Sequence, residues 1–495
     1  MLPFLSALIV AQTPPTLTPR NSAPTLTSPS RTVPSRPTPS PTPSLPPPET
    51  LPAFEELPLL ERLPHLEVMH PAELRSLPGR LDSVPVFNSN SPELVQTEGI
   101  LLSTFPPEGK RNRLAHLNFA FNGRFDIFSH HITRARTPEE TRSFYQGIIL
   151  YNPLTQPVTV EILQGASYLT RPDALFVTLP PVVDNPVGRV FAGPGSRAMN
   201  DILRGRRQEN LPSSVVVPPG QHYLLMNVPI PAGTVTPTSN GRSTLLRLQS
   251  SGPIYVANLA MRAPQNANGS ERPPELDEWE TLLVRGTLAG PRDLAPSALD
   301  APPNRIVYGR VAGVAEGSKW LAKLTDNEKS DRLTIPQSGR AFAYGLSTLH
   351  RGRLGTEQIQ SAKMLVRYPD TAYYAHGNYG VEYNLTLPLH NPTKERQTVT
   401  LSLSTPVKND TVQGTLLFFN PPEERIFFRG TVRLRFANDL GLMQTRYVHL
   451  VQNRGHLAEP LLTLELPPNS NRRVEVDFLY PPDATPPQVL MVQTQ

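Results

Sequence analysis

Hydrophobic and polar residues alternate over short stretches through most of the chain. In Val158-Thr-Val-Glu-Ile-Leu the apolar residues fall mainly at every second position, which is the pattern of a β-strand with one buried face. The runs at 244–249 and 253–261 flank Ser250-Ser-Gly and predict a hairpin. Strand-like runs at 305–314 and 340–345 open the second half. Short strands between turn residues favour β-sandwiches over an α/β sheet.

Helical patterns are confined to short segments. Residues 196–204 predict a helix that stops at Gly205. Residues 274–283 predict an amphipathic helix, because acids lie in its first turn and its apolar residues share one face. We also expect a short helix near 71–77.

The pattern of the first half returns in the second. Leu150-Tyr-Asn-Pro returns as Leu389-His-Asn-Pro, and Val217-Pro-Pro-Gly returns as Leu466-Pro-Pro-Asn. An earlier block, from residue 101 to 128, returns between 364 and 383. Blocks in one order with different loop lengths are typical of a duplicated domain.

This repeat predicts that Asn152-Pro153 and Asn391-Pro392 occupy the same turn, each just before a strand of matching position. The predicted fold is mostly β, with two tandem, internally duplicated β-sandwich domains of immunoglobulin-like or jelly-roll-like type, a few short helices and a disordered Pro-rich N-terminal tail. The expected segments are a signal peptide (1–11), a disordered Pro/Ser/Thr-rich linker (12–50), an irregular lead-in (51–83), a first copy (84–262), a connector with a short helix (263–304) and a second copy (305–495, repeat core 356–495).

Composition supports the mostly β prediction and excludes some classes of function. The 59 prolines disfavour long helices. The net charge of +5 comes mostly from scattered arginines, so nucleic acid is not an expected partner. The absence of cysteine excludes disulfides and thiolate sites.

The N-terminus predicts export. Residues 2–11 form an apolar run that is too short to span a bilayer and matches a secretory signal cleaved after Ala11. No Lys or Arg precedes the run, so a frayed terminus or a misplaced start codon is the alternative. No other segment reaches the length of a membrane span, and we expect a location in the periplasm or on the cell surface.

The candidate catalytic residues are two acids and two histidines. Asp126 and Glu382 fall at corresponding places in the repeat and could form the carboxylate pair of a glycoside hydrolase, or could simply be acids on the outer faces of strands. His116 and His376 also fall at corresponding places in the repeat. Each could act as a base or a metal ligand, or could make a structural hydrogen bond that both copies have in common.

A metal or anion site has weaker support. His130-His131 would point to opposite faces of a strand without a third ligand, so we expect no metal. The turn Gly193-Pro-Gly-Ser before a helix could hold an anion. The cluster Arg204, Arg206 and Arg207 could bind a polyanion or form a solvated face. We expect no cofactor, because no nucleotide-binding or catalytic motif is present.

Several long motifs resemble a cyanobacterial family known as a domain of unknown function, number 3370. The likeness covers about residues 70 to 495 and implies an exported cyanobacterial protein, without an activity to carry over. The motifs are Leu81-Asp-Ser-Val-Pro-Val-Phe-Asn-Ser-Asn-Ser-Pro, Ala192-Gly-Pro-Gly-Ser-Arg, Tyr308-Gly-Arg-Val-Ala-Gly-Val, Tyr344-Gly-Leu-Ser-Thr-Leu-His-Arg-Gly and Tyr480-Pro-Pro-Asp-Ala-Thr-Pro-Pro-Gln-Val-Leu.

The combined interpretation is a non-enzymatic, extracytoplasmic binding or structural protein of the cell envelope. Its expected partners are envelope polysaccharide or envelope proteins. The alternatives are a carbohydrate-active enzyme that uses a carboxylate pair, and a polyanion-binding module. Carboxyl groups about 5–10 Å apart in a cleft would favour the enzyme.

Overall fold

Strands dominate the computed structural model, which describes residues 65–301, 306–411 and 413–495. The expected signal peptide, the Pro-rich linker and residues 51–64 of the lead-in lie outside the described residues. The described part contains two α-helices, α1 (Ser196–Leu203) and α2 (Leu276–Arg285), and one 3-10 turn at Arg113–Ala115. The mostly β prediction is therefore confirmed.

The strands of the described residues form four sheets. The largest has twelve strands: β3 (Pro85–Ser89), β4 (Leu94–Val95), β5 (Gly99–Ser103), β6 (Phe121–Arg134), β7 (Phe144–Tyr151), β8 (Val158–Leu169), β10 (Ser214–Val217), β11 (His222–Ile230), β12 (Ser239–Arg262), β13 (Ala312–Glu316), β17 (Ala362–Arg367) and β18 (Tyr374–Ala375).

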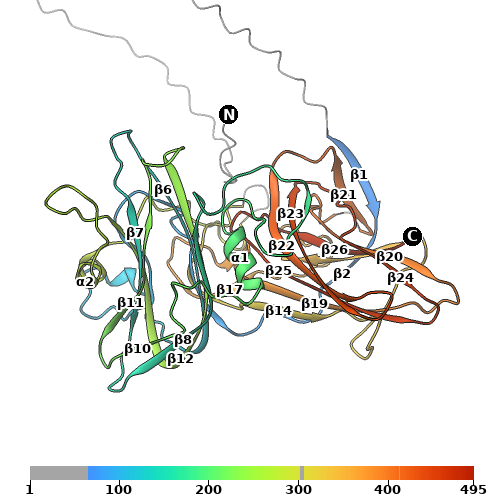
Figure 1. The fold of residues 1–495 in the computed structure, drawn as a ribbon, viewed down its shortest axis with the longest axis horizontal. Coiled ribbons are helices and arrows are strands. Elements are labelled where there is room, and N and C mark those ends of the chain that lie inside the picture. Colours follow the sequence, from blue (N-terminus) through green and yellow to red (C-terminus); the bar gives the residue numbers. More distant parts are fainter. Residues whose placement is uncertain (1–64, 302–305, 412) are drawn as a thin grey trace, which may run out of the picture. The chain divides into compact units, whose positions relative to one another are not determined.

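The second half of the chain supplies most of the other three sheets (Figure 1). A seven-stranded sheet contains β9 (Val182–Asp184), β14 (Lys319–Lys323), β15 (Leu333–Thr334), β19 (Glu382–His390), β22 (Ile426–Ala437), β23 (Met443–Asn453) and β25 (Asn471–Leu479). A five-stranded sheet contains β2 (Glu73–Arg75), β16 (Ala341–Leu346), β20 (Gln397–Ser404), β24 (Leu462–Leu466) and β26 (Gln488–Thr494). The last pairs β1 (Leu66–Pro71) with β21 (Thr415–Asn420).

The lead-in differs from its prediction. The segment expected to be irregular, with a helix near 71–77, instead contains β1 and β2. β1 pairs with β21 and β2 pairs with β16, so both join sheets of the second half. The helix prediction is wrong because distant partner strands take up the backbone hydrogen bonds of this short segment, and local propensity is only a weak prior.

The predicted hairpin at residues 250–252 is also wrong. The two runs that flank it form one strand, β12, whose register shifts between Ser250 and Ile254. Its first part pairs with β6 and β8, and its last part pairs with β7 and β5. Ser250-Ser-Gly is thus an irregularity at which the strand changes partners without reversing.

Alternation of side chains builds the cores. In β19, Tyr383, Leu385 and Leu387 are buried in the core shared with the five-stranded sheet. A second core lies within the twelve-stranded assembly and includes Phe125 of β6 and Leu246 of β12. The opposite faces of these strands are therefore free to carry polar residues at the junction of the two halves.

The halves are joined by strands and by α1. Residues His65–Gln495 pack as one compact unit. The expected boundary at residue 304 does not divide the sheets, because β13 pairs with β3 and carries β17 and β18 into the first-half sheet. In the other direction β9 pairs with β23, and α1 packs against β8, β22 and β25 (Figure 1).

Both predicted helices are present. α1 begins at Ser196 as predicted, after Gly195 as N-cap, and ends at Leu203. α2 begins two residues later than the predicted 274–283 segment, because Glu275 and Glu278 form a capping box.

Candidate functional site

Asp126 and Glu382 both lie against the guanidinium of Arg247. Arg247 stands on β12 directly opposite Asp126 of β6 and Gln164 of β8. Its Nε lies 3.9 Å from Asp126 Oδ2, and its Nη1 donates to Gln164 Oε1 at 3.1 Å. Arg124 Nη1 lies 2.5 Å from Asp126 Oδ1. Asp126 is only 1% exposed, so this ion pair forms inside the protein.

Glu382 reaches Arg247 from the second half. Glu382 Oε2 lies 2.6 Å from Arg247 Nη2, an ion-pair contact without the angle of a hydrogen bond. Lys319, its parallel neighbour on β14, places Nζ 3.2 Å from the same oxygen. Glu382 is 5% exposed. Arg247 therefore links a strand of the first half to a strand of the second.

The ionic contacts continue along the polar face of the seven-stranded sheet. Asn384 Nδ2 donates to Glu382 Oε1 at 2.8 Å and lies 2.7 Å from Asp477 Oδ1. Arg433 Nε donates to Asp477 Oδ2 at 2.9 Å, and Arg433 Nη1 donates to the carbonyl of Leu203 in α1 at 3.3 Å. The charged row thus also holds the helix that spans the junction.

The surroundings push the two acids in opposite directions. Burial raises the pKa of Asp126, against the attraction of Arg247 and Arg124. Burial also favours a higher pKa for Glu382, but the positive charges of Arg247 and Lys319 outweigh it, so the pKa of Glu382 is lowered. Glu382 is therefore the firmly ionised member, held by two cations.

This geometry is that of a buried ion-pair network. A hydrolytic pair needs open space between its carboxyl groups for the glycosidic bond or for a water molecule. Here the Arg247 guanidinium occupies that position, and both acids are nearly inaccessible. The arrangement neutralises charge and fixes the junction of the two halves.

The two acids do not occupy equivalent strands. Asp126 lies on β6, whereas Glu382 begins β19. β19 precedes the Asn391 turn as β7 precedes the Asn152 turn, so β19 matches β7 and not β6. The predicted correspondence of Asp126 with Glu382 is therefore wrong. The short sequence motifs around the two acids are alike, but the strands that carry them occupy different positions relative to the Asn-Pro turns.

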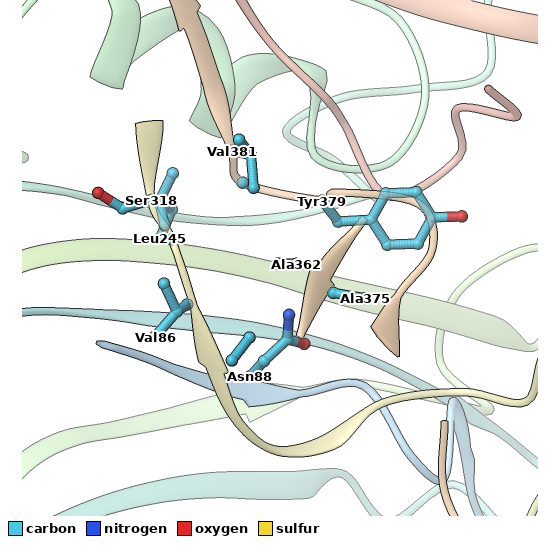
Figure 2. A pocket seen from close by; sticks show the side chains of 11 residues that line it. Val86, Asn88, Leu245, Ser318, Ala362, Ala375, Tyr379 and Val381 are labelled. Atoms are coloured by element: carbon cyan, nitrogen blue, oxygen red, sulfur yellow. The ribbon is translucent and has the colours of Figure 1, made fainter. Parts of the chain in front are cut away.

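A small pocket lies beside this network (Figure 2). Ser318 and Val381, the neighbours of Lys319 and Glu382, line it together with Val86 and Asn88 of β3. It has room for about one water molecule. The Asn88 amide oxygen is buried without a hydrogen-bond partner in the described residues and would suit such a water. The full lining is Val86, Asn88, Leu245, Ala315, Gly317, Ser318, Ala362, Ala375, Tyr379, Gly380 and Val381.

The two predicted histidines lie in different surroundings. His116 is buried after the 3-10 turn, and its Nδ1 lies 2.9 Å from Ser103 Oγ. Burial, with Lys110 nearby, lowers the pKa of His116 to about 4. His376 lies between β18 and β19, and its Nδ1 is buried without a partner in the described residues. Within the described residues the two rings make no equivalent hydrogen bond, so the interpretation of a structural hydrogen bond common to both copies is wrong.

His130 and His131 use separate partners. His130 Nδ1 lies 2.9 Å from Ser243 Oγ, whereas His131 Nδ1 lies 2.8 Å from the carbonyl oxygen of Pro92. His131 Nε2 lies 2.9 Å from Ser89 Oγ. Within the described ranges, no group of three or more His, Asp or Glu side chains is placed to hold a metal ion.

The predicted arginine cluster is used within the protein. Arg204 donates to Asn200 and to backbone carbonyls at 185 and 186, and its guanidinium lies 3.8 Å from the ring centre of Tyr447. Arg206 pairs with Asp201 at 3.2 Å, and Arg207 donates to the Ile162 carbonyl at 3.0 Å. Protein acceptors therefore already engage donors that a polyanion would need.

The turn before α1 is also occupied. Ser196 Oγ donates to the Gly193 carbonyl at 3.2 Å, and Ser196 is fully buried. A Cβ on Gly195 would strike Pro482, and one on Gly193 would strike Arg429. The glycines thus allow close packing of the two halves at the turn that the sequence offered as one possible anion site.

Arg247 is the functional residue that sequence reasoning missed. It stands in Thr244-Leu-Leu-Arg-Leu-Gln, where a single arginine looks like an exposed strand residue. A usable signal was present in the second half, where Arg473, Glu475 and Asp477 alternate with apolar residues. Such a row of charges on one strand face indicates cross-strand ion pairs.

Comparisons with known proteins add a family and no activity. A family model described as "Protein of unknown function (DUF3370)" matches residues 72–494. No curated protein matches the chain. Among solved structures, the chain is similar to that of the Macrobrachium rosenbergii nodavirus at 10% identity, over 92% of this chain and 97% of that one, with a TM-score of 0.12. A score this low carries no inference. None of the helices in the described residues is long and apolar enough to cross a membrane.

Proposed function

The chain belongs to the DUF3370 family, and we propose that it is a non-enzymatic binding or structural protein of the cell envelope that acts outside the cytoplasm. We infer from the resemblance noted in the sequence that its host is a cyanobacterium. The apolar run that ends at Ala11 supports export.

One observation carries the non-enzymatic part of the proposal. The candidate acids Asp126 and Glu382 share Arg247 as a counter-ion and are nearly inaccessible to a substrate. Removing one partner of a buried ion pair is strongly destabilising, because it leaves an uncompensated buried charge. We infer that these residues set the geometry of the two halves, so that the outer surface can bind a partner.

The duplication belongs to the same proposal. We infer that the halves descend from one β-sandwich of immunoglobulin-like or jelly-roll-like type. The matching turns at Asn152 and Asn391 support this inference. In both halves the next strand pairs with the strand that ends at a Pro-Pro pair: β8 with β10 and β20 with β24.

Cell fractionation with N-terminal sequencing tests the location. The mature protein should be found in the periplasm or on the surface and begin at or near Gln12. An intact Met1 on a purely cytoplasmic pool would contradict export.

Two further measurements test the role. The tagged mature chain should capture envelope polysaccharide or envelope proteins from its host. Incubation with envelope polysaccharide should release no reducing ends above those of the matched variant Glu382→Gln. Release that depends on Glu382 would favour the carbohydrate-active enzyme.

A further inference from the structure

Lys408, in the second half of the chain, lies in a cluster of positive charges. It belongs to the connection between β20 and β21, and it is partly buried. The guanidinium groups of Arg425 and Arg454 are close enough to act on it. Among the described residues, no carboxylate lies within ion-pair distance of Lys408 or Arg425, whereas Arg454 pairs with Glu423. The ammonium group therefore faces like charges without a direct counter-ion.

The nearest acid is committed elsewhere. Asp410 attracts Lys408, but its two carboxylate oxygens accept hydrogen bonds from the backbone amides of Gly352, at 3.0 Å, and Leu354, at 2.7 Å. This carboxylate holds the 352–354 loop and is only a remote counter-charge for Lys408.

Two polar groups without a well-formed hydrogen bond in the described residues lie around the loop that Lys408 also approaches. A Cβ on Gly352 would lie 3.4 Å from Lys408 Cδ, and the ring of His350 in the same loop lies 5.9 Å from that of His376. The rings of Tyr308 and His376 are 4.4 Å apart, and the positive charge of Lys408 disfavours a proton on His376. In the part of the chain that the structure describes, His376 Nδ1 and the Tyr308 hydroxyl are both buried without a well-formed hydrogen bond, although the backbone of Arg351 approaches the hydroxyl. Buried polar groups are rarely left unpaired, because each costs free energy.

We propose that Lys408, His376 and Tyr308 form a binding site for an oxyanion group, either a small free oxyanion or a sulfate, phosphate or carboxylate on an acidic polysaccharide. An oxyanion supplies the acceptors that these groups lack and the negative charge that the cluster lacks. The site deepens the proposed binding function and rests on it. It also gives a polyanion a location that Arg204, Arg206 and Arg207 do not provide.

Protonation gives the site a pH dependence. Burial, Arg425 and Arg454 lower the pKa of Lys408 to about 8, and Asp410 opposes them. Burial, His350 and Lys408 lower the pKa of His376 to about 3, so this ring stays neutral over the useful range. Ligand affinity should be full below pH 8 and fall as the pH rises through that value.

Inorganic sulfate is the probe, because its charge is constant over this range. Calorimetric titration of the full chain with sodium sulfate, against sodium chloride at equal ionic strength, should show binding that Lys408→Met weakens about tenfold or more. Lys363→Met is the matched control, because Lys363 is exposed on β17 and should leave the affinity unchanged. Equal affinity in the wild type and Lys408→Met, or no binding by either, would overturn the proposal.

Two readouts remain if Lys408→Met fails to fold. Arg425→Gln changes an exposed side chain and should weaken sulfate binding severalfold, because it lowers the local positive potential. The Lys408 signal of ¹³C-lysine-labelled protein should titrate near pH 8 in chloride and at higher pH in sulfate. If the Lys408 signal titrates at the same pH in sulfate as in chloride, the proposed site is contradicted.

Immobilised dextran sulfate separates the two sources of the oxyanion. Retention that Lys408→Met abolishes indicates a polymer ligand, whereas sulfate binding without retention indicates a free ion. Export without sulfate binding removes the site and leaves the proposed function intact. Sulfate binding by a protein that is found only in the cytoplasm would support the site and contradict the proposed function.

Discussion

Asn152 and Asn391 hold their turns with the same set of hydrogen bonds. Each Nδ2 donates to the carbonyl four residues later and to the carbonyl just before a Pro-Pro pair, and each Oδ1 accepts the amide two residues later. The four carbonyl acceptors are Gln156 at 2.8 Å and Val217 at 2.9 Å in the first half, and Glu395 at 2.8 Å and Leu466 at 3.0 Å in the second. One amide thus ties together two connections in each half, and the predicted equivalence of these turns is confirmed.

Removing either amide should destabilise the protein to a similar extent. Asn152 and Asn391 are both fully buried, so Asn152→Ala and Asn391→Ala each leave backbone carbonyls unpaired. We expect each to lower the free energy of unfolding by about 1–3 kcal/mol. Denaturant unfolding measures this. Asn471→Ala is the control, because Asn471 is exposed and its one side-chain hydrogen bond within the described residues is to His390. A large loss at only one of the two buried asparagines would contradict their equivalence.

Arg247 should be the most sensitive charged residue of the junction. Arg247→Met leaves Asp126 and Glu382 without their shared counter-ion, and we expect a loss of about 3–5 kcal/mol in unfolding free energy. Adding Asp126→Asn and Glu382→Gln should restore part of that loss, because neither of the two side chains that faced Arg247 then carries a negative charge. Arg473→Met is the control: its side chain is 65% exposed, and the cost should be within about 0.5 kcal/mol. An equal cost at both arginines would contradict a special role for burial.

The sequence predicted strands and turns more reliably than their partners. The alternation at residues 158–163 and the Asn-Pro turns depend on neighbouring residues, and both are present in the structure. The pairing of β1 with β21 joins segments more than 300 residues apart, and no local pattern encodes it. For the same reason β13 was assigned to the second copy, although it pairs with β3 of the first-half sheet.

The candidate site was only half visible in the sequence. Asp126 and Glu382 stood out because each acid lies between large apolar residues. Their common partner Arg247 did not stand out, because its role depends on which face of β12 lies against β19. That face follows from how the two halves pack, which an alternating pattern in one strand does not specify.

Acid should weaken the contribution of Glu382. Its folded-state pKa lies below the ordinary 4.5, so its ionised form adds stability above pH 4.5, which is lost as the pH falls through the lowered value. The loss in melting temperature caused by Glu382→Gln should therefore be largest near pH 7 and shrink below about pH 4.

Asp126 provides the opposite case. Because its pKa is raised, protonation favours the folded state, and its contribution is lost as the pH rises through the raised value. Melting curves of Asp126→Asn should show a difference from the wild type that changes with pH in the opposite direction. Parallel pH profiles for the two variants would contradict the assignment.

Buried His130 should make the protein acid-sensitive at a higher pH than either carboxyl group. Burial, with His131 and Arg310 nearby, lowers the pKa of His130 to about 3, against an ordinary value of 6.5. The unfolded chain therefore takes up this proton first, and stability falls as the pH drops below 6.5. His130→Asn should make the fall in melting temperature between pH 6.5 and 4 less steep, whatever its effect at pH 7, while buried histidines such as His116 and His376 continue to contribute. An unchanged slope would show that other groups control acid unfolding.

The approach of α1 to the second half depends on Gly195. This residue has φ of 71° and is the N-cap of α1, and a Cβ at this position would strike the ring of Pro482. Gly195→Ala therefore imposes backbone strain and a steric clash at the junction of the two halves. Gly109→Ala isolates the first effect, because Gly109 has the same φ of 71° and nothing within 4 Å of the added Cβ. We expect Gly109→Ala to cost about 1 kcal/mol of unfolding free energy and Gly195→Ala several times as much. Equal costs would mean that Pro482 yields freely and that α1 does not fix the two halves against each other.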